Sequence, residues 1–100
     1  MDITVQELKE KLDRKDDFLF IDVREQHEYD EFNLGAQLRP LNDFVLNLSE
    51  FEDHKDKEVV VHCRSGARSG MAQQYMQDAG FKNVRNLTGG VLHWAEVHGT

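Results

Sequence analysis

The only cysteine of the chain, Cys63, follows an apolar run and opens a polar loop. The loop combines small and cationic residues: Cys63, Arg64, Ser65, Gly66, Ala67, Arg68 and Ser69. Backbone N–H groups in such a loop, its two arginines and the start of a following helix all favour the anionic form of a nearby thiol. Because the thiolate is the nucleophilic form of sulfur, we predict that Cys63 is a catalytic nucleophile.

Only a modest lowering of the thiol pKa is needed to make such a cysteine reactive. A free thiol with a pKa near 8.5 is only about 3% ionised at pH 7, and lowering that pKa by roughly two units requires ~2.7 kcal/mol. Gly66 permits the positive φ that a loop needs in order to turn its N–H groups inward. The alternative is an inert, buried cysteine, which is a common structural role. Two neighbouring arginines do not stabilise an uncharged, buried cysteine, whereas they do stabilise a thiolate. The loop therefore favours a reactive Cys63.

Strands and helices alternate along the chain. Apolar runs predict strands at residues 18–21, 35–41, 59–61 and 84–87. Helical spacing predicts helices at residues 5–12, 25–32, 42–51 and 69–78, and a last one after residues 89–90. A capping box at Thr4 precedes the first helix, and Asn42 or Asp43 is expected to cap the third. This order is typical of a mostly parallel sheet with helices on both faces, a three-layer α/β/α architecture.

The polar segments that end these strands are expected to meet. Ligands in open parallel sheets bind at the carboxyl ends of the strands. Asp22 and Arg24 follow the first strand, the Cys63 loop follows the central one, and residues 88–90 follow the last. We therefore expect these three segments to lie along one edge of the sheet.

Composition predicts one globular domain spanning residues 1–100, with 39% hydrophobic and 31% charged residues. A net charge of -7 without a basic stripe argues against nucleic acid as a partner. No apolar run approaches the roughly 18 residues of a membrane span, and residues 1–4 do not resemble a signal peptide. A single cysteine excludes an internal disulfide, so a reducing compartment such as the cytoplasm is expected.

Over essentially its whole length the chain resembles single-domain members of the rhodanese (thiosulfate sulfurtransferase) family. The resemblance rests on residues 21–25, on 27–29, on the strand and loop 61–69, on 87–90 and on Trp94. It implies a rhodanese-like α/β/α fold with about five strands in a central, mostly parallel sheet. It also implies an enzyme in which Cys63 becomes a persulfide and passes sulfane sulfur on.

The resemblance implies the partners as well. The donor is a small anion such as thiosulfate, and the acceptor is cyanide, a thiol or a protein that takes up sulfur. No cofactor is expected, and the histidines lack metal-ligand spacing with Cys63, so no metal is expected either.

The remaining loop residues are candidates for substrate binding. Arg64 and Arg68 are expected to bind the anionic group of the donor, although loop arginines are also ordinary surface residues. Ser65 and Ser69 are candidate donors to the sulfur, and helix capping is the favoured role for Ser69. The backbone of Gly66 and Ala67 completes the binding loop.

Three further positions have structural interpretations. Asp22 and Arg24 are expected to form a strand-end pair that orders the loops. The resemblance suggests a position at the edge of the site, and a structural ion pair is the favoured interpretation of both residues. Strand alternation points His62 away from the Cys63 side chain, which favours a core histidine over a general base. Trp94 is expected to anchor the last helix on the sheet.

Two other functions stay open from the sequence. One is a regulatory or sulfur-carrier module that uses the same fold without turnover. The other is a cysteine-dependent phosphatase or arsenate reductase. This function is disfavoured because the loop that begins at the nucleophilic cysteine is one residue longer in those enzymes than the segment from Cys63 to Arg68.

Overall fold

Four parallel strands form the centre of the computed structural model, which describes residues 2–99. The elements in chain order are α1 (Val5–Asp13), β1 (Leu19–Asp22), α2 (Gln26–Glu31), β2 (Gln37–Leu38), α3 (Leu41–Leu46), the 3-10 helix η1 (Leu48–His54), β3 (Glu58–His62), α4 (Ala67–Asp78), β4 (Asn83–Asn86) and α5 (Gly90–His98). The strand order is β2-β1-β3-β4. This is the α/β architecture that the sequence predicts, with four strands rather than about five. An isolated parallel bridge between Ile3 and Leu87 extends the pairing beyond β4.

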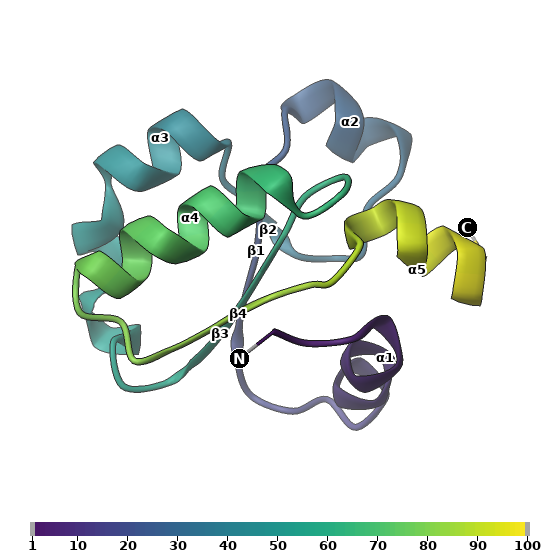
Figure 1. The fold of residues 1–100 in the computed structure, drawn as a ribbon, viewed down its shortest axis with the longest axis horizontal. Helices are drawn as coiled ribbons and strands as arrows, with labels where there is room; N and C mark the ends of the chain where they lie inside the picture. The colour runs from purple at the N-terminus through teal and green to yellow at the C-terminus, as the bar shows by residue number, and fades with distance from the viewer. Residues whose placement is uncertain (1, 100) are drawn as a thin grey trace.

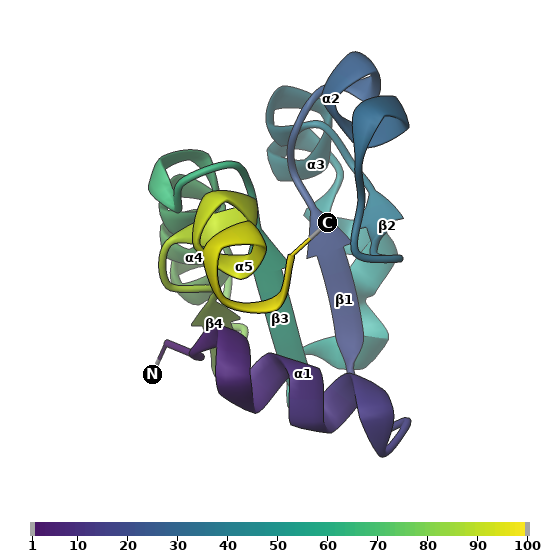
Figure 2. The same cartoon turned by 90° about the vertical axis from the view of Figure 1, so that its right-hand side faces the viewer.

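Helices cover both faces of this sheet (Figure 1). Alternate residues of β3 separate the two cores, because successive side chains of a strand point to opposite faces. Val59 and Val61 pack with Phe44 of α3 and Met76 of α4. Val60 packs on the other face with the buried side of α1, and Trp94 of α5 packs against that same core, as expected for an anchor. Figure 2 shows α1 crossing the lower ends of the strands while α2 lies beyond their upper ends.

The N-terminal helix begins where its capping box predicts. The Thr4 side chain accepts a hydrogen bond from the N–H of Glu7, and the Glu7 carboxylate accepts one from the N–H of Thr4, each at 3.1 Å. The sequence prediction for this helix is confirmed.

The region after β2 differs from its prediction. The N-cap of α3 is Pro40, not Asn42 or Asp43, and the helix ends at Leu46 instead of continuing to residue 51. Asn47 explains the early end, because its side-chain amide donates to the carbonyl of Asp43 at 2.8 Å and competes with the helical backbone bonds. The chain continues as the separate 3-10 helix, and β2 itself is limited to two residues.

Candidate active site at the Cys63 loop

Cys63 lies directly after β3, and four residues later the chain enters α4. The turn between them depends on Gly66, which has φ +110° and is the N-cap of α4. A side chain rarely adopts this left-handed conformation, so glycine is the residue that suits the position. Because of this turn the helix begins at Ala67, two residues earlier than the sequence predicts.

The Cys63 sulfur is surrounded by hydrogen-bond donors and is only 1% exposed. Its Sγ accepts from the N–H of Gly66 at 3.1 Å, from the N–H of Ser69 at 3.4 Å and from the Ser69 hydroxyl at 3.3 Å. Burial raises the pKa of the Cys63 thiol, but hydrogen bonds from the hydroxyl and N–H of Ser69 and from the N–H groups of Gly66 and Ser65 outweigh it. The pKa therefore lies below its ordinary value, and the loop stabilises a thiolate.

Ser69 has a different position from the one that we expected. It does not cap α4, because Gly66 does, and its side chain is buried against the sulfur. The Ser69 hydroxyl also donates to Oδ1 of Asn86 at 2.6 Å. A hydroxyl has one proton, so Ser69 donates either to Asn86 or to the Cys63 sulfur at any moment.

Asn86 is a residue of the site that sequence reasoning missed. Its side-chain amide donates to the carbonyl of Gly66 at 3.1 Å, while its Oδ1 accepts from Ser69. One side chain thus holds the turn and orients the hydroxyl beside the sulfur. The sequence signal was limited to its place near the end of the last predicted strand. The parallel register, which pairs Asn86 with Val61, puts it beside the Cys63 loop.

The start of α5 holds the carbonyl groups of the loop. The N–H of Val91 donates to the carbonyl of Cys63 and the N–H of Leu92 donates to the carbonyl of Arg64, each at 3.1 Å. Gly90 lets the two segments approach this closely. A Cβ atom on Gly90 would lie 2.4 Å from the Arg64 carbonyl oxygen and 2.6 Å from that of Cys63.

The two arginines of the loop have different surroundings. Arg68 donates two hydrogen bonds to the carboxylate of Glu28, at 2.7 and 2.8 Å. The hydrogen bond from Arg68 lowers the pKa of Glu28 to about 2. Arg64 is exposed and has no hydrogen bond or ion pair with the side chains of residues 2–99. Arg64 is therefore the loop cation whose charge is not already compensated.

Asp22 and Arg24 form a buried ion pair at the end of β1. The Arg24 guanidinium donates to both carboxylate oxygens at 2.8 to 3.0 Å, and it also donates to the carbonyl of Phe32 at 2.7 Å. Through Phe32, the C-cap of α2, this pair holds the end of that helix against the end of β1. Its position next to the loop matches the expected edge of the site, while a role in catalysis stays a prediction.

His62 is fully buried, as a core histidine would be. Its ring nitrogens have no hydrogen-bond partner within the described part of the chain, and Nε2 lies 3.6 Å from the Asp22 carboxylate. Burial lowers the pKa of His62 to about 4, so the ring is neutral near pH 7.

The structure thus brings most of the candidate loop residues around one sulfur atom. Gly66 and Ser69 contact it directly, Ser65 contributes its N–H, and Ala67 starts the helix behind it. No group of three or more His, Cys, Asp or Glu side chains within residues 2–99 is arranged to hold a metal ion. No helix in that range has the length and apolarity to cross a membrane.

Comparison with known proteins connects this geometry to a family. The family model described as rhodanese-like domain matches residues 4–97. A sulfurtransferase from Allochromatium vinosum is 35% identical over 99 residues, which cover 98% of this chain and 90% of the relative. YrkF of Bacillus subtilis, which carries a provisional sulfur-carrier name, is 32% identical over 93% of this chain, and the match spans 50% of that longer protein.

A solved structure agrees with the sequence matches. The crystal structure of a rhodanese-like domain protein from Staphylococcus aureus superimposes with a TM-score of 0.81 and 30% identity, covering 94% of this chain and 91% of that one. The similarity therefore includes the sheet, both helical layers and the segment that contains Cys63.

Proposed function

The chain belongs to the family of rhodanese-like domains, and on this basis we propose that it transfers sulfane sulfur through a persulfide on Cys63. The observation that supports this proposal most directly is the set of donors around the sulfur. Two backbone N–H groups and one hydroxyl contact Sγ, and the pKa of the thiol is lowered. The same donors suit the negative charge of a persulfide, because its sulfur atoms also accept hydrogen bonds.

In the first half-reaction the Cys63 thiolate attacks the outer sulfur of a donor such as thiosulfate. The new S–S bond forms on Sγ, the S–S bond of thiosulfate breaks, and its electron pair leaves with sulfite. Cysteine persulfide and sulfite together have the same charge as the thiolate and thiosulfate. Arg64, which is exposed and uncompensated, is the residue that we assign to the anionic end of the donor.

In the second half-reaction a nucleophilic acceptor, cyanide or a thiol, attacks the outer sulfur of the persulfide. The persulfide S–S bond breaks, and its electron pair returns to Sγ as the thiolate. Neither step needs a cofactor, because each attack forms one bond to the transferred sulfur and breaks one S–S bond. The bond formed in the second step is S–S with a thiol acceptor and C–S with cyanide.

A second candidate is a sulfur carrier that delivers the persulfide to a protein. The similarity to YrkF favours this alternative. It uses the same first half-reaction and differs only in the acceptor, so comparing release to cyanide with release to candidate thiol proteins separates the two.

Intact-mass spectrometry after incubation with thiosulfate tests the proposal. The expected result is a gain of one sulfur atom that either cyanide or dithiothreitol removes, and no gain in the Cys63→Ser variant. Because the chain has one cysteine, the adduct has only one thiol on which to form. An unchanged mass in protein whose Cys63 reacts with a small alkylating agent would contradict sulfur transfer.

A further inference from the structure

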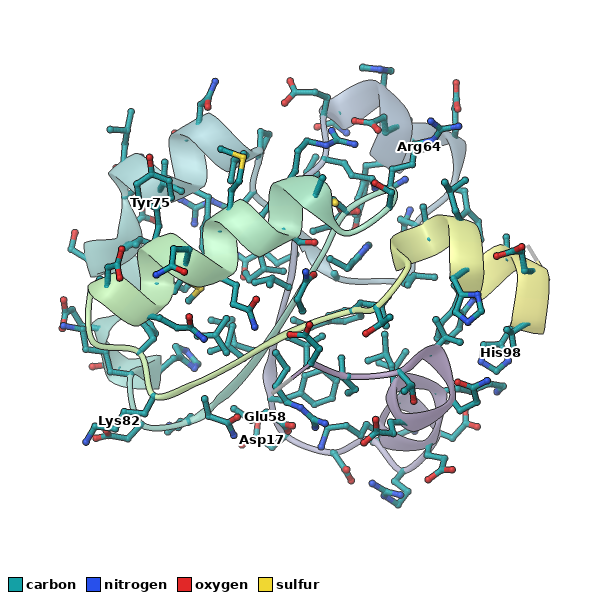
Figure 3. The ribbon with its side chains drawn as sticks, in the orientation of Figure 1. Asp17, Glu58, Arg64, Tyr75, Lys82 and His98 are labelled. Carbon is teal, nitrogen blue, oxygen red and sulfur yellow. The ribbon has the colours of Figure 1, made fainter. Side chains whose placement is uncertain are left out.

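A pocket of about 220 Å³ lies between α2 and α5, beside the Cys63 loop. Four of its lining residues are apolar: Phe32, Val91, Leu92 and Ala95. The other four are charged, and Arg64 is among them. Figure 3 shows the Arg64 side chain at the end of the molecule that holds α2 and the start of α5.

The pocket borders the loop that carries the nucleophile. Arg64, the residue after Cys63, lines it, and two further lining residues, Val91 and Leu92, donate their N–H groups to the carbonyls of Cys63 and Arg64. A molecule in this pocket therefore lies against the Cys63 loop, at the residue that follows the nucleophile.

Two of the four charged residues in the pocket are already neutralised. Arg24 is paired with Asp22, and Glu28 is paired with Arg68. These pairs contribute little net charge to the pocket.

The other two charged residues are Arg64 and Glu31. Both are exposed, and neither makes a hydrogen bond or an ion pair with another side chain of residues 2–99, nor with one another. The pocket thus offers one uncompensated cation, one uncompensated anion and several apolar lining residues. A ligand that matches all three features has a carboxylate, an ammonium group and a short apolar stem.

We propose that this pocket binds the sulfur acceptor, and that the acceptor is a small thiol with an α-amino acid group. The carboxylate contacts Arg64, the ammonium group contacts Glu31, and the stem packs on Phe32 and Leu92. The volume is below the roughly 300 to 1,000 Å³ of pockets for drug-sized ligands, which favours a molecule about the size of one amino acid. This inference rests on the proposed persulfide and names the acceptor that removes its sulfur.

The bonds exchanged in this step balance. The acceptor thiolate attacks the outer sulfur of the Cys63 persulfide, and a new S–S bond forms on the acceptor. The S–S bond at Cys63 breaks, and its electron pair stays on Sγ. The transferred sulfur keeps the negative charge that it carries in the Cys63 persulfide, so the products are a small-molecule persulfide anion and the Cys63 thiolate.

Single-turnover release from thiosulfate-loaded protein tests the assignment with four acceptors. L-cysteine has both charged groups, 3-mercaptopropionate lacks the ammonium group, cysteamine lacks the carboxylate, and cyanide lacks both. For each acceptor the second-order rate constant of a variant is divided by that of the unsubstituted protein. This ratio cancels the intrinsic nucleophilicity of the acceptor.

The informative variant is Glu31→Gln, and Asp30→Asn is its matched control. Asp30 is exposed, lies next to Glu31 on α2 and does not line the pocket. We expect Glu31→Gln to lower the rate constants for L-cysteine and cysteamine about two- to fivefold, the size of an exposed charge pair. Those for 3-mercaptopropionate and cyanide are expected to stay within error, and Asp30→Asn is expected to change none of them.

Arg64→Gln completes the test at the second charged residue. It is expected to slow L-cysteine and 3-mercaptopropionate, and to leave cysteamine unchanged. The inference is overturned if Glu31→Gln affects all thiols equally, if Asp30→Asn has the same effect, or if only a protein thiol accepts the sulfur. Failure to form any persulfide is a different result, because it contradicts the proposed function itself.

Discussion

Glu28 of α2 and Arg68 of α4 are joined by two hydrogen bonds, of 2.7 and 2.8 Å, although they are 40 residues apart in sequence. The pair links the helix beyond the strand ends to the helix that follows the nucleophile. It also compensates the charge of Arg68, which the sequence suggests as a ligand for the anionic donor. Arg64 and Arg68 therefore differ in the structure, although the sequence suggests the same role for both: Arg68 is paired with Glu28, and Arg64 makes no such pair.

The variant Glu28→Gln tests the stabilising effect of this pair. The folded-state pKa of Glu28 is about 2, below the ordinary value near 4.3, so the pair stabilises the fold fully above pH 4.3 and loses this effect as pH falls toward 2. Because Arg68 is partly exposed, we expect a loss of about 1 kcal/mol or less at pH 7. Urea unfolding at several pH values measures it, and the two proteins should converge near pH 2. A difference that does not vary with pH contradicts the prediction.

The variant Ser69→Ala tests the hydroxyl beside the sulfur. Removing this donor is expected to raise the pKa of Cys63 by about one unit, since a hydrogen bond to a charged group contributes about 1.5 kcal/mol or more. The pH dependence of alkylation by iodoacetamide reports that pKa. Ser65→Ala is the control, because Ser65 contributes its backbone N–H and keeps it in the variant. Equal midpoints for both variants would rule out the assigned role of Ser69.

The variant Asn86→Asp tests the residue that the sequence did not reveal. The carboxylate keeps an acceptor for Ser69 but loses the donor to the Gly66 carbonyl, and it adds a negative charge near the thiolate. We expect the pKa of Cys63 to rise by about one unit or more. Asn83→Asp adds the same charge at an exposed position of β4 and is the matched control. If both variants shift the alkylation midpoint alike, the effect is one of net charge and not of this contact.

The variant Gly90→Ala tests the close approach of α5 to the loop. Gly35→Ala is the control, because both glycines have positive φ, of +58° and +86°, but a Cβ atom on Gly35 meets nothing within 4 Å. Gly35→Ala is expected to cost about 1 to 2 kcal/mol for its backbone conformation. Gly90→Ala is expected to cost about 1 to 3 kcal/mol more, and to slow alkylation of Cys63, because the contact is with backbone atoms. Equal losses of stability would contradict a steric role.

Local patterns were sufficient to predict much of this molecule. The β-branched run of β3, the capping box at Thr4 and the small residues around Gly66 each depend on near neighbours in sequence. Such signals predicted the parallel architecture and the place of Cys63 at a strand end. Donors from its own loop then surround the sulfur.

Contacts between distant segments were beyond the reach of those patterns. Asn86 looked like an ordinary residue of a short strand until the parallel register placed it beside the loop. No local pattern predicts the pair of Glu28 and Arg68, because it joins α2 to α4 across 40 residues of sequence. Ser69 has the sequence of a capping residue, but the left-handed Gly66 ends the turn first and directs the Ser69 side chain inward.

The hydrogen bonds from Val91 and Leu92 to the carbonyls of Cys63 and Arg64 have a consequence for local unfolding. The two donors belong to α5, the last helix, whereas every donor to the Cys63 sulfur precedes that helix in the sequence. Detachment of α5 alone would therefore release the backbone of the loop while the rest of the sheet stays folded. The order of the nucleophile loop thus depends on the docking of a C-terminal element that does not touch the sulfur.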